Sequence, residues 1–385
     1  MFARGNYKMI SADYLNAYPY QLGICLPMEI LLRLFPGLNL NLTMQLVNVA
    51  MALGAAAAMA ALGRTIFEDS RISRACEAAG LLVWPALLFC QQVYGTIPML
   101  FFVSLAMLCY AKYVKTRRRA LGAAFACLLA LAYAAKINAA VALIAVTICS
   151  VLDALENRKL EPLAYAALAI ALSLLLLRAI IWQYERRSGV TLNSGIGALA
   201  RLTMGMQEGG GAAGWFNRYT ERFFPLEVTR AAAARYRAGR FESAAGGNGA
   251  KPRADGGVFP REVLQPVDGT DDGHALERRA QRTYRCIWRD GGALLRKGSH
   301  GAGNAAGRIP AGALCVLRGG HHRYASRQEA EWALPAAASD FFGGALYHLL
   351  FEAKSQYAFP YAVLLLPVAA MGICRIEDGL KRKRA

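Results

Sequence analysis

The sequence predicts an all-α, polytopic transmembrane helix bundle that is interrupted by one irregular segment rich in Ala, Gly and Arg. Of the 385 residues, 56% are hydrophobic and only 18% are charged, and the mean hydropathy is +0.27. The apolar residues are clustered in windows almost without charge, such as Gly80–Cys90 and Met99–Tyr110, as helices that cross a bilayer must be. We therefore expect a multi-pass protein of the cell membrane that is embedded in the lipid bilayer.

Apolar runs predict six spans in the first half of the chain and one near its end. They are Leu42–Leu62, Ala75–Gln91, Gly95–Val114, Leu121–Ala134, Ile137–Leu152, Leu163–Trp182 and Tyr357–Cys374. Leu121–Leu152 allows one long tilted helix as an alternative. Because Lys136 would place a charge in the middle of that helix, we favour two short helices that meet at a polar point.

Charge asymmetry predicts how these spans are oriented. The connector Lys112–Arg119 carries five basic residues, whereas Gln91–Pro98 carries none. The positive-inside rule therefore makes the first connector cytoplasmic and the second external. Five regions follow: 1–41 external, 42–182 a transmembrane bundle, 183–230 external, 231–340 irregular, and 341–385 an external helix, the last span and a basic cytoplasmic tail.

The N-terminal region lacks the apolar run that would deliver an external segment across a membrane. We therefore expect a first span upstream of Met1. The Leu-rich face of Gln21–Phe35 predicts an interfacial helix on the outer leaflet.

Residues 231–340 differ in composition from the rest of the chain. About half are Ala, Gly or Arg, four of the five His residues are there, and no helical or strand period persists. We interpret this segment as codons read in a shifted frame, with a disordered linker as the alternative.

Two motifs in this segment are not expected to form sites. Three glycines spaced like those of a dinucleotide-binding loop (Gly301, Gly303, Gly307) lack the preceding strand and following helix that such a loop needs. Four residues of types that bind metals (Cys286, Cys315, His321, His322) lack the closely spaced pairs of a zinc site.

We therefore expect no cofactor and no metal. The nine cysteines include no CxxC pair and lie mostly in apolar runs, which is typical of small core residues. The formal charge of +18 comes largely from Lys and Arg that flank apolar runs, so it indicates topology and lipid contact rather than nucleic-acid binding.

Polar residues near the spans are the candidate ligands of a site. Lys136 predicts contact with an aqueous cavity or an anion, and snorkelling to an interface is the alternative. Before the last span, Glu352, Lys354, Gln356 and Tyr357 would gather at the external mouth of the bundle. Such a group suits a phosphate and sugar hydroxyls, although an ordinary interfacial belt has a similar composition.

Five motifs, in this order, resemble membrane glycosyltransferases of the GT-C superfamily, in the branch near protein O-mannosyltransferases and aminoarabinose transferases. They are AYPYQLG at Ala17–Gly23, VYGTIPMLFF at Val93–Phe102, LAYAAKINAAVALI at Leu131–Ile144, RLTMGMQE with GWFNRYT at Arg201–Glu208 and Gly214–Thr220, and GGALYHLLFEAKSQYAFPYAVLLLP at Gly343–Pro367. The resemblance implies transfer of a sugar from a polyprenyl-phosphate donor to an acceptor glycan, lipid or protein on the external face. It also implies that Tyr18 and Gln21 contact substrate.

In that family an acidic residue just after the first span usually serves as the general base. We expect this base upstream of Met1, and the present chain to be inactive. Asp13 is the catalytic candidate within the chain, although it lies closer to AYPYQLG than the family pattern places it. Relatives often carry Arg-Tyr before the last span. This chain has Gln356 and Tyr357 there, which leaves the phosphate to Lys354.

A multi-span transporter or lipid flippase is the alternative function, and a non-catalytic membrane scaffold is a third. A transporter typically shows inverted repeats and polar residues at the bilayer midplane. The sequence shows no inverted repeat, and its polar residues cluster at the expected external ends. Both observations favour the enzyme.

Overall fold

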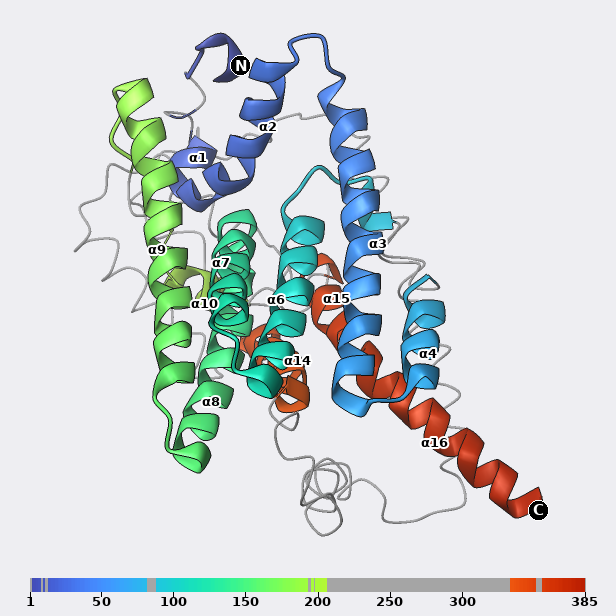
Figure 1. Cartoon of the computed structure of the whole chain (residues 1–385). Helices are drawn as coiled ribbons and strands as arrows, with labels where there is room; N and C mark the ends of the chain where they lie inside the picture. The colour runs from blue at the N-terminus through green and yellow to red at the C-terminus, as the bar shows by residue number, and fades with distance from the viewer. Residues whose placement is uncertain are drawn as a thin grey trace, which may run out of the picture. The chain divides into compact units, whose positions relative to one another are not determined.

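The computed structural model describes residues 2–7, 10, 13–81, 88–192, 195–196, 198–205, 333–350 and 355–384 (Figure 1). Within these ranges every regular element is a helix. The expected irregular segment 231–340 lies outside them, apart from its last eight residues, which form the start of a helix.

The first part of the chain forms η1 (Phe2–Arg4), α1 (Asp13–Ala17), η3 (Pro19–Gln21), α2 (Leu22–Leu34), α3 (Leu40–Phe67) and α4 (Ser70–Leu81). There follow α6 (Thr96–Thr116), α7 (Arg119–Ala135), η4 (Ile137–Ala139), α8 (Ala140–Asn157), α9 (Glu161–Ser188) and α10 (Ala198–Gly205). The described chain ends with α14 (Ala333–Leu350), α15 (Ser355–Leu364) and α16 (Leu366–Arg384).

Four described segments are long and apolar enough to cross a membrane: α3, α6, η4 with α8, and α9. A fifth span results if α15 and α16, which meet at a bend of 46°, are counted together. The all-helical expectation is thus confirmed for the described residues, and four to five helices have the length and composition of membrane spans. The expected span Ala75–Gln91 coincides only in part with α4, because residues 82–87 lie outside the described ranges.

The chain breaks at Lys136, as the charge in the middle of the apolar run predicts. There α7 ends and the backbone becomes extended, with φ −161° and ψ 126°, before η4 and α8 begin. The alternative of one long helix is therefore wrong. The break places the end of α7 and the starts of α6 and α8 at one end of the bundle, which we call the Lys136 end.

Helix α6 lies at the centre of the bundle, in contact with α3 and α7 (Figure 1). Its buried residues include Tyr110 and Tyr113, whose rings meet Phe125 of α7 at centroid distances of 5.3 and 5.9 Å. Aromatic pairs at such distances stabilise a core beyond the apolar area that they bury. The same core cluster includes Phe359 of α15, which stacks on Phe89.

Ion pairs join the helices at the opposite end of the bundle. Arg117 donates to both carboxylate oxygens of Asp153, at 2.6 and 2.7 Å, and the Asp153 side chain is fully buried. A buried carboxylate requires such a partner, since an unpaired one would cost several kcal/mol. Arg71 similarly links Asp69 to Asp378, which ties α4 to α16. We call this the Arg117 end.

Helices α1 and α2 lie over the Lys136 end, between the upper parts of α9 and α3 (Figure 1). The carboxylate of Glu29 on α2 is buried and accepts from Arg33 at 2.8 Å and from Arg187 of α9 at 3.1 Å. The expected helix at Gln21–Phe35 is therefore present as α2, and this ion pair fastens it to α9.

Candidate functional site

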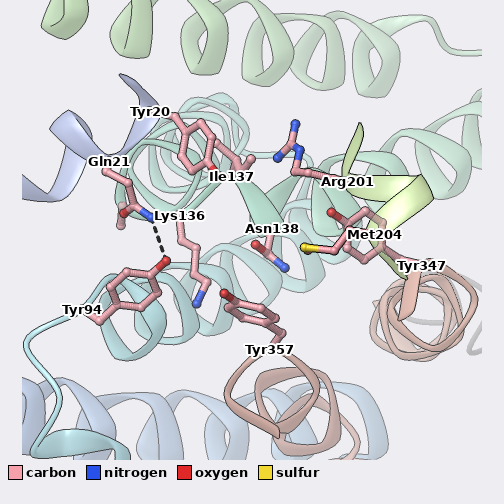
Figure 2. A pocket seen from close by; sticks show the side chains of 11 residues that line it. Tyr20, Gln21, Tyr94, Lys136, Ile137, Asn138, Arg201, Met204, Tyr347 and Tyr357 are labelled. Atoms are coloured by element: carbon pink, nitrogen blue, oxygen red, sulfur yellow. Dashed lines mark hydrogen bonds between the residues drawn. The ribbon is translucent and has the colours of Figure 1, made fainter. Parts of the chain in front are cut away.

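A cavity of about 60 Å³ opens at the Lys136 end, and we call it the Lys136 pocket (Figure 2). Its volume is enough for roughly four to six water molecules. It is lined by Tyr20, Gln21, Tyr94, Ala135, Lys136, Ile137, Asn138, Arg201, Met204, Tyr347 and Tyr357. These residues come from segments that are far apart in the sequence.

Two close backbone contacts shape the pocket around the end of α7. A Cβ atom on Gly23 of α2 would lie 1.9 Å from the carbonyl oxygen of Ala134. A Cβ atom on Gly95, which precedes α6, would lie 2.0 Å from the carbonyl oxygen of Ala135. Only glycine permits backbones to approach this closely. Both glycines therefore hold their segments directly beside Lys136.

The ammonium group of Lys136 is surrounded on several sides. Lys136 as a whole residue is only 7% exposed, and its Nζ donates to the hydroxyl of Thr96 at 2.7 Å. It also lies 4.3 Å from the ring centroids of both Tyr94 and Tyr357, so that it points between the two rings (Figure 2). Cation–π contacts on two faces and one hydrogen bond replace part of the lost hydration.

The helix ends reinforce this arrangement. Lys136 follows the C-terminus of α7, where the partial negative charge of the helix favours a cation. Its ammonium reaches Thr96, the first residue of α6, whose N-terminal N–H groups carry partial positive charge. The C-terminus of α7 thus stabilises the ammonium, and the ammonium adds to the positive potential at the N-terminus of α6.

A second cation, Arg201 of α10, lines the pocket beside Tyr20, with its guanidinium carbon 5.6 Å from the ring centroid. The Nε of Arg201 is buried and has no hydrogen-bond partner among the described residues. Burial raises the pKa of Tyr20, and the nearby Arg201 opposes this shift only in part. Tyr20 is therefore a neutral phenol at physiological pH.

The pocket combines positive charge with hydrogen-bonding groups. Its described lining residues include two cations and no carboxylate. Gln21 donates to the hydroxyl of Tyr94 at 2.7 Å, and the hydroxyl of Tyr361 donates to the carbonyl oxygen of Asn138 at 3.4 Å. Such a site favours an anion that also carries hydroxyl groups.

Contacts among the flanking segments position α10 and the tyrosines. The N–H of Ile196, just before α10, donates to the carbonyl oxygen of Ala17 at 2.8 Å. The ring of His348 on α14 stacks on Tyr357 of α15, with centroids 6.2 Å apart and planes at 8°. These contacts connect the second cation and the Tyr357 ring to the rest of the bundle.

The sequence-predicted site residues fall into three groups. Gln21, Lys136 and Tyr357 line the same pocket. Tyr18 lies outside the lining set, but its ring contacts that of Tyr20 at 5.9 Å. Glu352 and Lys354, and the side chains of Asp13 and Gln356, lie outside what the structure describes. Whether any of them binds substrate or catalyses a reaction stays a prediction.

Sequence reasoning singled out neither Tyr94 nor Arg201 as a site residue, although both lie within motifs of the GT-C resemblance. The charge of Arg201 within an otherwise apolar stretch was the available signal.

Comparison with known proteins found no matching family model, no matching curated protein and no matching solved structure.

The approach of Gly95 to α7 gives a first prediction. Replacing Gly95 by Ala forces a Cβ atom against the Ala135 carbonyl, and we expect a loss of stability of roughly 1–3 kcal/mol, as for other overpacked sites. The control is Gly372→Ala on α16, where a Cβ meets nothing within 4 Å and alanine should be neutral or stabilising. Thermal unfolding in detergent measures both, and equal melting temperatures would contradict the assigned contact.

Proposed function

We propose that this protein is a membrane glycosyltransferase of the GT-C type, which takes a sugar from a polyprenyl-phosphate donor and transfers it to an acceptor glycan, lipid or protein. The proposal rests on one observation above all. A buried lysine and an arginine line one cavity together with four tyrosines, at a break between apolar helices. The motifs that resemble the GT-C family contribute most of these residues.

The charges fit the leaving group of such a reaction. Cleavage of the bond between sugar and phosphate leaves negative charge on the lipid phosphate. Preorganised cations and helix N–H groups stabilise that charge without reorganising. In this proposal Lys136 and the N-terminus of α6 bind the phosphate, and Arg201 provides the second charge-assisted contact.

The remaining lining groups fit a sugar. Tyr20, Tyr94, Tyr347 and Tyr357 provide apolar ring faces together with hydroxyl groups, and Gln21 and Asn138 provide amides. Tyrosine combines an apolar body with a polar end, which suits a ring that is itself apolar on its faces and polar at its rim. The acceptor hydroxyl would lose its proton to a general base, for which Asp13 stays the candidate within the chain.

We further propose that the Lys136 end faces the outside of the cell membrane and the Arg117 end the cytoplasm. The five basic residues of Lys112–Arg119 support this orientation. A lipid flippase, the alternative function, would also use a cationic pocket for a lipid phosphate. It would move the donor between leaflets instead of cleaving it.

The second prediction tests donor binding. Lys136→Met keeps the length of the aliphatic stem but removes the charge, and losing one charge-assisted hydrogen bond costs about 1.5–3 kcal/mol. We expect the Kd for a polyprenyl-phosphate sugar to rise by roughly 10- to 100-fold in a binding assay on the reconstituted protein. Lys112→Met, at the exposed Arg117 end, is the matched control. An unchanged Kd for Lys136→Met would show that the donor does not bind in the Lys136 pocket.

We expect the present chain to bind the donor without transferring its sugar, so translocation is measured on the same preparation. Movement of intact donor between leaflets supports the flippase, whereas binding of the donor without such movement supports the glycosyltransferase.

The third prediction tests the orientation. On a cysteine-free background, Gln91→Cys and Arg119→Cys place thiols at exposed positions of opposite ends. We expect a membrane-impermeant maleimide to label Gln91→Cys in intact cells, and Arg119→Cys only after permeabilisation. The reverse pattern would overturn the proposed orientation.

A further inference from the structure

Helix α16 continues beyond the part that packs on the bundle, and Figure 1 shows it running obliquely past the end of α4. Its inner face carries Ala370, Met371 and Cys374, which are all buried. They form a cluster with Ile72 and Cys76 of α4 and with Ala60 of α3. The salt bridge of Arg71 with Asp378, at 2.7 Å, fixes α16 on α4 one turn further along.

The opposite face of α16 carries an exposed apolar stripe. Ile373, Ile376 and Leu380 are 58%, 65% and 54% exposed. Their spacing of three and four residues places them on one side of a helix. None of the described segments covers them, and three large aliphatic side chains in a row are costly to expose to water.

Positively charged residues lie on the same helix as this apolar stripe. Helix α16 carries five cations, which are Arg375, Lys381, Arg382, Lys383 and Arg384, against two acids. Both acids already have partners within the protein, since Glu377 pairs with Lys381 and Asp378 with Arg71.

We propose that the C-terminal half of α16 lies in the headgroup layer of the membrane and binds anionic lipids. The stripe Ile373, Ile376 and Leu380 would enter the boundary with the acyl chains, and the cations would contact lipid phosphates. Continuity with the candidate span favours lipid over a protein partner. The bent helix pair that passes the length and composition test for a span runs from Tyr357 through Arg382, so the stripe is continuous with that span. The cations of α16 begin at Arg375, which favours a position of this half of the helix at the headgroup level.

The surface is distinct from the Lys136 pocket, because its residues lie on α16 and include none that line the pocket. It therefore does not depend on sugar transfer. A protein that binds no polyprenyl-phosphate donor would still use α16 in this way.

The fourth prediction concerns a fluorophore at this stripe. An environment-sensitive dye is attached to Leu380→Cys in the full chain, on a cysteine-free background. The labelled protein is placed in nanodiscs of phosphatidylcholine alone or mixed equally with phosphatidylglycerol. We expect blue-shifted emission and several-fold weaker quenching by acrylamide, a neutral quencher, in the anionic discs, with the difference reduced at high salt. Equal quenching in both lipids would overturn the proposal.

Charge variants separate this effect from folding. We expect the joint change of Arg375→Gln, Lys381→Gln and Arg382→Gln to abolish the response to phosphatidylglycerol, and Arg375→Lys with Arg382→Lys to preserve it. The matched control removes three cations elsewhere at the Arg117 end, by Lys112→Gln, Arg118→Gln and Lys159→Gln, and should keep the response. A response that survives the first variant, or disappears in the control, would contradict the assignment to α16.

Discussion

Burial of the Lys136 ammonium is the constraint on which the arrangement of the Lys136 end depends. A charge in an apolar bundle is costly unless other groups replace its hydration. Here the Thr96 hydroxyl, two tyrosine rings and the C-terminus of α7 do so. These groups come from the start of α6, the end of α7 and the start of α15. The need to replace the hydration of the Lys136 ammonium thus determines how three separate parts of the chain meet.

The same arrangement accounts for the chemistry that we propose. The ammonium of Lys136 contacts the Thr96 hydroxyl and two tyrosine rings, and the adjoining cavity contains a second cation, Arg201. An anion that enters the cavity therefore meets positive charge in a region of low dielectric, where such contacts are stronger than in water. The ion pair of Glu29 with Arg33 and Arg187 holds α2 over this end of the bundle, so the pocket is bounded by fixed elements.

Much of the fold could be predicted from the sequence, because apolar runs specify membrane-length helices directly. The break at Lys136 was also predictable, since one charge within such a run makes a continuous helix costly. The residues at which helices end could be predicted less well. Helix α9 extends to Ser188, beyond the predicted Trp182, because hydropathy reports where apolar character ends, while Glu185, Arg186 and Arg187 continue the helix outside that layer. The pairing of Lys136 with Tyr94 and Tyr357 joins residues far apart in the chain, and no local pattern encodes it.

The most direct test is a structure of the protein in nanodiscs with a bound polyprenyl-phosphate sugar, determined by electron cryomicroscopy. It asks whether the Lys136 pocket is the binding site for the lipid phosphate. The proposal predicts phosphate density within hydrogen-bonding distance of the Lys136 Nζ, with Arg201 directed at the same group and the sugar among the tyrosines. Density for the donor elsewhere on the protein, with the Lys136 pocket unchanged, would contradict it.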